Sequence, residues 1–246
     1  MSGARHLILR LEAPLAAFGG VAIDQVGITR DFPAASMLTG LIANALGYRR
    51  TETAAHQALQ DRLVFAARRE HEPVLGRLTD TQNAQLAADD KGWTTFGAPE
   101  GRAGASYGAP HRRRRDYHAD VLMTVALRLD PAETDPTLER IEAALDRPAR
   151  PLFLGRKPCL PSAPLYRGFV MAETAGEALR LVPSGSPGAG ASERLRALWP
   201  VDEAPVTGAE IERIYPLPDI RNWTTGLHGG TRMIAEGSLM PAEAAP

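Results

Sequence analysis

The chain has 246 residues, of which 44% are hydrophobic and 23% are charged, and its 28 basic residues nearly balance its 29 acidic ones. This composition favours an ordered core over a disordered chain, and the single cysteine, Cys159, excludes a disulfide framework or a zinc site built from several cysteines. Because no apolar run reaches the ~20 residues of a membrane helix and the N-terminus lacks the apolar segment of a signal peptide, we expect a cytoplasmic protein with no membrane partner.

The first part of the chain carries strand and helix patterns in turn. Alternating leucines over residues 6–11 predict a strand. An apolar stripe over residues 37–46 predicts a helix, with Ser36 as its N-cap and Gly47 as its C′ residue. A shorter helix is expected over residues 53–60, and a second strand over residues 63–69.

Residues 72–117 follow a different pattern. They are rich in Gly, Asp, Arg and Ala, and their apolar residues follow no sustained period. A structureless loop of this length is uncommon inside a compact domain. We therefore predict an inserted β-hairpin arm with a mobile tip.

Residues 121–129 alternate cleanly and give the strongest strand pattern in the chain. Asp135 and Pro136 are the expected N-cap and first residue of a helix that continues to about Leu145. Up to residue 150 the order is strand, helix, strand, insertion, strand, helix. This order fits an α+β, ferredoxin-like (split βαβ) domain over residues 1–150 with its helices on one face of the sheet.

The remaining segment, residues 151–246, has weaker patterns and is assigned to a reduced C-terminal subdomain. Residues 166–172 form a candidate strand. The Gly- and Ser-rich residues 183–192 predict a flexible loop, and residues 240–246 predict a frayed tail.

The basic residues are almost all arginine, with Lys91 and Lys157 as the exceptions. GC-rich coding explains such a bias without any function, whereas guanidinium groups also suit phosphate recognition. Four arginines run in sequence from Arg112 to Arg115. On an inserted arm such a run indicates a polyanion-binding surface, and Tyr117 beside it favours single-stranded nucleic acid. The alternative is a solvated loop.

A second basic motif is Leu154-Gly155-Arg156-Lys157. A glycine beside two cations allows the backbone to approach a phosphate closely, although the spacing is not that of a P-loop. Catalytic motifs are weaker. His111, Tyr117 and His118 suggest acid–base cleavage of RNA, but surface or RNA-contacting histidines are the preferred interpretation. We expect no catalytic residue, no metal and no cofactor.

Several motifs in order carry a family resemblance. Residues 7–19, the run from Thr29 to Ser36, and residues 38–41 resemble the N-terminal signature of the fifth family of CRISPR-associated proteins, in the RAMP superfamily. Arg115-Asp116-Tyr117, residues 153–159 and residues 164–168 continue the match. The resemblance covers residues 6–170 well and the remainder loosely.

The resemblance implies a ferredoxin-like domain, an inserted thumb and a reduced, β-rich C-terminal part. It also implies a non-catalytic, RNA-binding subunit of a type I-E Cascade complex in antiviral defence. Such a subunit caps the 5′ repeat-derived handle of the CRISPR RNA, contacts the backbone subunit and the large subunit, and meets target DNA indirectly. The alternative, from the type I-C branch, is a metal-independent endoribonuclease that processes precursor CRISPR RNA.

The charge pattern and the resemblance together select candidate sites. The aromatics of the insertion lack an apolar face of their own and are expected partner anchors, unless they pack on the chain's own sheet; they are Trp93, Phe96 and Tyr107. The candidate RNA-binding residues are Arg30, Ser36, Arg112, Arg113, Arg114, Arg115, Tyr117, Leu154, Gly155, Arg156 and Lys157.

Overall fold

The computed structural model describes residues 3–20, 22–23, 25–72, 76–84, 92–93, 99–100, 111–186 and 193–243. The helices are α1 (Ala35–Leu46), α2 (Thr53–Asp61), α3 (Leu138–Asp146) and α4 (Ala175–Leu181). The strands are β1 (Ala4–Ala16), β2 (Ala22–Ile23), β3 (Val26–Gly27), β4 (Leu63–Arg69), β5 (Arg77–Ala84), β6 (Gly92–Trp93), β7 (Pro99–Glu100), β8 (His111–Leu129), β9 (Tyr166–Ala172), β10 (Leu195–Pro200), β11 (Glu210–Leu217) and β12 (Arg232–Leu239). Within these ranges, no helix is long and apolar enough to cross a membrane.

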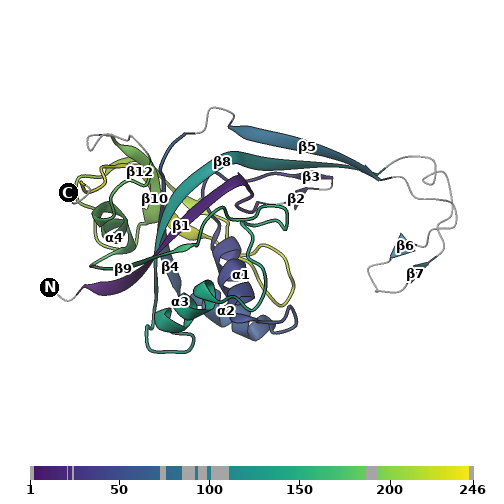
Figure 1. Cartoon of the computed structure of the whole chain (residues 1–246), viewed down its shortest axis with the longest axis horizontal. Helices are drawn as coiled ribbons and strands as arrows, with labels where there is room; N and C mark the ends of the chain where they lie inside the picture. The colour runs from purple at the N-terminus through teal and green to yellow at the C-terminus, as the bar shows by residue number, and fades with distance from the viewer. Residues whose placement is uncertain are drawn as a thin grey trace.

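Four strands form the centre of one large sheet, in the order β4-β8-β1-β9, and every neighbouring pair is antiparallel. Helices α1 and α2 connect β1 to β4, and α3 connects β8 to β9 (Figure 1). In chain order, the four central strands and the helices that connect them therefore follow the succession strand, helix, strand, strand, helix, strand. The α+β fold class expected from the sequence is confirmed.

The two faces of this sheet have separate cores. Helices α1, α2 and α3 cover one face (Figure 1), where Leu9 of β1 and Leu127 of β8 pack with Leu38 of α1. Each fully buried side chain of this size contributes about 1.5–3 kcal/mol. Helix α4, which the sequence pattern did not predict, packs Leu179 on the opposite face near Ile8. The expectation of helices on one face concerned residues 1–150, whose helices α1, α2 and α3 share one face, and α4 lies outside that segment.

The sheet continues beyond the central strands. Strand β10 pairs with β4, β12 pairs with β10, and β11 pairs with β12. Strand β9 has the predicted bounds and lies beside β1. One sheet thus runs through both segments that the sequence analysis divided at residue 150.

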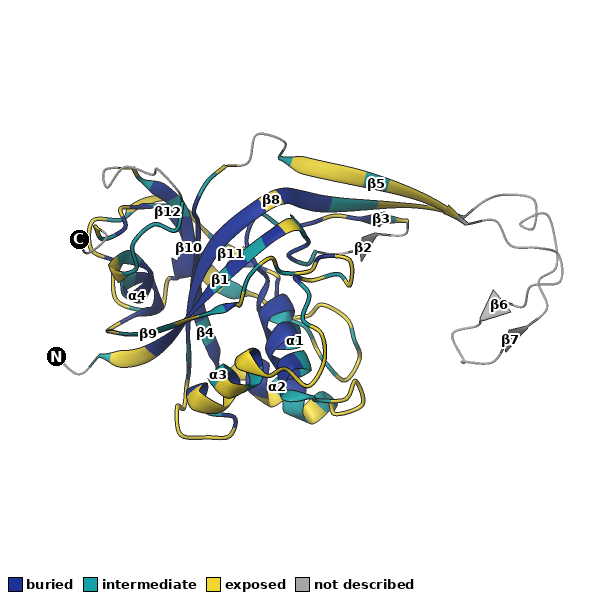
Figure 2. Cartoon of the chain, in the orientation of Figure 1, coloured by how far each residue is buried: buried dark blue, intermediate teal, exposed yellow. Residues whose placement is uncertain are grey.

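A hairpin lies in the segment where the sequence predicts an insertion. Strand β5 pairs with the first half of β8 without a register shift, from Arg77 opposite His118 to Ala84 opposite His111. Figures 1 and 2 show this hairpin extending away from the helices, with β5 largely exposed. We call residues 77–84 and 111–118 the arm.

The structure corrects two predicted helix caps. Ser36 is not the N-cap of α1. Ala34 precedes the helix, and the Asp219 carboxylate accepts a hydrogen bond of 2.9 Å from the Ala35 N–H. At the other end Gly47 has a φ of 85° and closes the helix as predicted. Helix α3 begins after Thr137, whose hydroxyl accepts from the N–H of residue 140, and not after the Asp-Pro pair at 135–136.

Parts of the predicted flexible loop and frayed tail are anchored. The Glu70 carboxylate accepts hydrogen bonds from the Ser184 hydroxyl at 3.0 Å and from the Gly185 N–H at 2.9 Å. Residues 187–192 lie outside the described ranges. In the tail, the Ala242 N–H donates to the Arg180 carbonyl at 2.7 Å, so fraying from residue 240 is wrong. Residues 244–246 also lie outside the described ranges.

Candidate nucleic-acid interface

A large open groove of about 1180 Å³ lies between the base of the arm, the corner that joins α1 to α2, and the loop before β12. None of its described lining residues is Asp or Glu. Six arginines give it a positive character; these are Arg49, Arg50, Arg115, Arg150, Arg156 and Arg221. His56 and His228 also line it. A concave surface with this charge matches a polyanion.

The arm-base wall of the groove is built where β3 pairs with β8. Gly27 lies opposite Arg115 in this parallel pair. A Cβ on Gly27 would lie 2.6 Å from the Arg115 Nη1 atom and 2.9 Å from the Arg156 Nη2 atom. Two guanidinium groups from distant segments therefore meet over one glycine, and both line the groove.

Hydrogen bonds hold Arg156 in this position. Its guanidinium donates to the Asp116 carbonyl at 2.8 Å and to the Gly27 carbonyl at 2.9 Å, and it lies 4.9 Å above the Tyr117 ring. Tyr117 itself is buried. The prediction that Tyr117 stacks on an RNA base is therefore not retained, because the ring supports Arg156 instead.

The 154–157 motif also divides into structural and exposed residues. Leu154 is fully buried in the core, and its carbonyl accepts a 3.0 Å hydrogen bond from the Ala17 N–H. Gly155 has a φ of 90°, and a Cβ there would lie 1.6 Å from the Ala17 carbonyl oxygen. A glycine is thus required at position 155 because a side chain would clash with the backbone just after β1. The close approach of a phosphate is not needed to explain it. Arg156 and the exposed Lys157 remain as candidate phosphate contacts.

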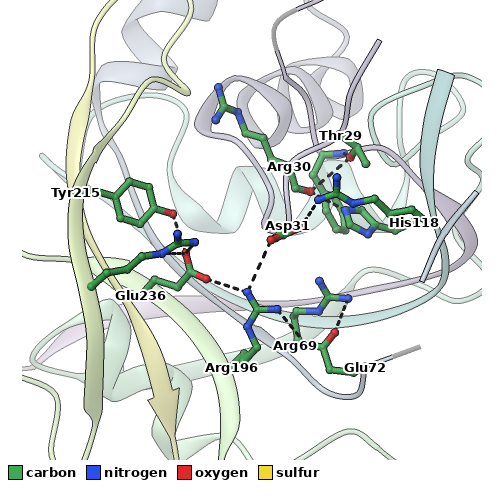
Figure 3. Close-up of polar contacts among 12 residues, drawn as sticks. Thr29, Arg30, Asp31, Arg69, Glu72, His118, Arg196, Tyr215 and Glu236 are labelled. Atoms are coloured by element: carbon green, nitrogen blue, oxygen red, sulfur yellow. Dashed lines mark hydrogen bonds and ion pairs between the residues drawn. The ribbon is translucent and has the colours of Figure 1, made fainter. Parts of the chain in front are cut away.

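Arg30 lies in the loop after β3 and is not among the described residues that line the groove. Its backbone is fixed, because the buried His118 ring donates from Nε2 to the Arg30 carbonyl at 2.6 Å. Figure 3 shows the Arg30 side chain extending away from His118, and its guanidinium donates to the Pro218 carbonyl at 2.7 Å. Burial lowers the pKa of His118. A neutral, buried ring in this bond is poorly suited to acid–base chemistry on RNA.

A neighbouring polar cluster is internally neutralised (Figure 3). Arg196 of β10 contacts three carboxylates, Glu236 at 2.9 Å, Glu72 at 3.4 Å and Asp31 at 3.7 Å. Burial, followed by the hydrogen bond to Glu236, raises the pKa of Tyr215 to about 12. This cluster joins β10, β11 and β12 to the loops after β3 and β4. It is a structural network and not a phosphate site.

The four-arginine run does not form one surface. The register between β5 and β8 is continuous through it, so successive side chains point to opposite faces of the arm. Arg113 shares a face with Arg115, which lines the groove. Arg112 and Arg114 are exposed on the other face. Arg113 therefore continues the face of the arm that lines the groove, whereas Arg112 and Arg114 point away from the groove.

The remaining candidates are only partly located. Ser36, in the first turn of α1, is half-buried and lines the groove. Trp93 lies in β6 opposite Pro99 of β7, but its side chain is outside the described part of the structure. Phe96 and Tyr107 fall entirely outside the described ranges. Their expected role as partner anchors stays a prediction.

The far side of the groove is not marked by any motif in the sequence. Arg49 and Arg50 stand at the corner between α1 and α2, and Arg221 comes from the loop before β12. These residues are far apart in sequence, and no local run marks them. The paired arginines after a helix C-terminus and Trp223 in a polar loop were the available signals.

Residues 6–234 match the family described as "CRISPR-associated protein (Cas_Cas5)". The chain is 31% identical over 174 residues to the "CRISPR system Cascade subunit CasD" of Escherichia coli (strain K12), a match that covers 71% of this chain and 75% of that protein.

Two solved structures share the fold. A chain of a "CRISPR RNA-guided surveillance complex" superposes with a TM-score of 0.67 at 22% identity, covering 98% of this chain and 94% of that one. A "Crystal structure of Cas protein" superposes with a TM-score of 0.63 at 23% identity, covering 98% and 100% of the two chains. The family match over most of the chain and the identity to its curated relative lead to one conclusion: this chain belongs to the Cas5 family of CRISPR-associated proteins.

Proposed function

We propose that this chain is a non-catalytic, RNA-binding subunit of a type I-E Cascade surveillance complex, where it binds and caps the 5′ repeat-derived handle of the CRISPR RNA. The observation that carries the proposal is the groove lined by six arginines and no described carboxylate. The relative in Escherichia coli, named as a Cascade subunit, supports the assembly role. The backbone and large subunits of the complex are the proposed protein partners.

In this proposal the arm-base wall of the groove binds the phosphates of the handle. Arg115 and Arg156 converge at Gly27, and Lys157 follows on an exposed loop. Arg113 continues the same face along the arm. Phosphate contacts of this kind hold a nucleic acid in register, whereas base contacts give sequence preference. Trp93, Phe96 and Tyr107 are proposed to anchor the insertion on the adjacent backbone subunit.

The ribonuclease alternative has weaker support. Two of its three candidate groups, Tyr117 and His118, are buried, and His118 is bonded to a backbone carbonyl. A general acid or base must reach the proton that it transfers. We therefore expect repeat-derived RNA to remain intact after incubation with the purified chain, with or without chelator.

The salt dependence of RNA binding tests the proposal. The variant Arg115→Ala/Lys157→Ala removes two proposed phosphate contacts, so the slope of log K against log salt should flatten by about 1.4, or about 0.7 for each contact. The control Arg147→Ala/Arg167→Ala removes two exposed arginines that do not line the groove. It should leave the slope unchanged. Equal slopes for the native chain and both variants would contradict the proposal.

A further inference from the structure

We propose that the outer end of the large sheet, on the face that carries α4, is a docking surface for a basic and apolar segment of another protein subunit. The surface consists of five apolar residues, which we call the outer patch; they are Val201, Ile211, Ile214, Pro216 and Met233. This inference rests on the proposed function, because it requires a complex of several subunits. It names a surface on the face of the sheet that α1, α2 and α3 do not cover.

Strand pairing brings the residues of the outer patch together. Ala235 of β12 lies opposite Trp199 of β10 on one side and Ile214 of β11 on the other. Directly opposite residues of antiparallel strands point to the same face. Trp199 and Ala235 belong to the core beneath α4, so Ile214 points to that face as well. Met233, two positions earlier on β12, shares the face and lies opposite Pro216.

The layer that covers this face ends before it reaches the outer patch. Helix α4 packs on β4, β8, β9 and β10, and the loop after β10 adds the buried Val206 beside it. Strands β12 and β11 follow beyond β10 in the sheet. There the exposed fraction rises to 37% for Val201, 48% for Met233 and 51% for Ile214. A sheet buries its apolar face against a second layer, and a contiguous exposed apolar patch marks an interaction surface.

The partner packs on the face of the sheet and does not extend its edge. Strand β11 is the last strand of the sheet, but a register shift between Ile211 and Arg213 interrupts its pairing with β12. Pro216 further along the strand has no N–H to donate. Bulges, prolines and charged side chains on an edge strand oppose the addition of another strand. Side chains of the partner therefore contact the outer patch from above the sheet.

The charges around the outer patch select a basic partner. Three exposed acidic residues border it, in the loop after β10 and in β11; they are Asp202, Glu210 and Glu212. Glu210 lies 3.4 Å from Arg194, whereas Asp202 and Glu212 form no ion pair within the described part of the chain. Arg213 points to the opposite face, where it contacts Glu236 at 2.7 Å. An apolar surface with an acidic border repels a phosphate backbone and attracts Lys or Arg.

The same charges disfavour a second copy of this chain as the occupant. In a two-fold dimer the same surface of each copy faces the other, so the acidic borders would oppose one another. The occupant is therefore a different subunit, which presents apolar side chains bordered by Lys or Arg. Because the outer patch and the basic groove differ in charge, the chain binds this subunit and the RNA at separate surfaces.

The affinity of the full chain for its partner subunits tests the inference. The probe is the backbone and large subunits mixed with repeat-derived RNA. Ile214→Ser removes an exposed apolar side chain of the outer patch, and the control Met171→Ser makes a similar change on β9, the strand at the other edge of the sheet. Ile214→Ser should bind the probe about tenfold more weakly, and Met171→Ser should bind it like the native chain. Both variants should keep the native affinity for RNA alone and the native unfolding temperature.

Two further measurements test the chemistry of the contact. Glu212→Lys should weaken binding of the probe more than Glu212→Gln does, and the difference should shrink at high salt. In the native chain, oxidation of Met233 by hydrogen peroxide should be slower in the assembled complex than in the free chain, because the partner covers the sulfur.

The remaining outcomes are decisive against the inference. Native affinity of Ile214→Ser for the probe, or equal oxidation of Met233 in the free and assembled chain, would overturn it. A dimer of the isolated chain that Ile214→Ser dissociates in sedimentation velocity would assign the outer patch to a second copy. If the native chain binds repeat-derived RNA but neither subunit, this inference fails and the RNA-binding groove stands. A chain that joins the subunits but binds no RNA would instead contradict the proposed function.

Discussion

The substitution Gly27→Ala should weaken RNA binding without unfolding the protein. The added Cβ would lie 2.6 Å from Arg115 Nη1, 3.2 Å from Arg115 Cδ and 2.9 Å from Arg156 Nη2. The Arg115 tip must therefore retreat by about 0.8 Å to reach ordinary contact. The bond from Arg156 to the Gly27 carbonyl is strained by the same atom. Both guanidinium groups leave their positions over β3.

The expected magnitudes separate binding from stability. A lost or misplaced phosphate contact worth about 1.4 kcal/mol lowers the affinity tenfold. Alanine in a strand is favoured over glycine by roughly 0.5–1 kcal/mol, which offsets the displaced side-chain contacts. The unfolding midpoint should therefore stay within a few degrees of the native value, because the clashing atoms are mostly flexible side-chain tips.

The assay is RNA affinity by fluorescence anisotropy together with thermal unfolding of the same sample. The matched control is Gly185→Ala, whose Cβ would meet the Arg10 guanidinium at 3.5 Å, an ordinary contact outside the groove. Unchanged RNA affinity in Gly27→Ala would refute the role of the arm-base wall. A large loss of stability in Gly27→Ala would show that the added methyl group displaces the β3 backbone and not the ends of the two arginine side chains.

Two further predictions concern the framework. Gly155→Ala places a Cβ 1.6 Å from the Ala17 carbonyl oxygen at a φ of 90°, so it should destabilise the chain by about 2–4 kcal/mol in urea unfolding; native stability would show that the loop does not pack on β1. Because the pKa of Tyr215 is raised from 10.0 to about 12, its stabilising contribution is complete below pH 10 and is lost as the pH rises through 12. Tyr215→Phe should flatten the pH dependence of unfolding over this window, and an unaltered profile would contradict the partly buried hydrogen bond to Glu236.

The central fold could be predicted because its elements bury one periodic face each. The leucines of β1 and the alternation of residues 121–129 both point into the core that α1 covers. The C-terminal strands were missed because their pattern is interrupted. Strand β12 is buried on both faces and carries Glu236 in its centre, where Arg196 and Arg213 neutralise it. No local sequence rule anticipates a carboxylate buried by distant partners.

The candidate site was only partly predictable for the same reason. Arg115 and Arg156 stood in recognisable basic motifs, and the fold brings them together over Gly27. Tyr117 and Leu154 are their sequence neighbours, but both are buried: Tyr117 shares the face of Arg115 at the point where β8 enters the core, and Leu154 packs into the core after Phe153. Proximity in sequence to an arginine did not indicate proximity to the groove.

The cap of α1 illustrates the limit of local patterns. Ser36 has the side chain that N-caps prefer, yet Asp219 supplies the hydrogen bond from nearly two hundred residues away. Arg49 and Arg221 form the far side of the groove through a similar long-range contact between α2 and the 218–230 loop. Charge counts alone cannot locate such a surface, because its members belong to separate elements.

The most direct test of the account is ultraviolet crosslinking of repeat-derived RNA to the full chain, with mass spectrometry of the crosslinked peptides. The groove predicts crosslinks in the segments around Gly27, Arg115 and Lys157, and in residues 48–53 or 221–228. Crosslinks concentrated on α4, on the opposite face of the sheet, would contradict the assignment of this groove as the RNA-binding surface.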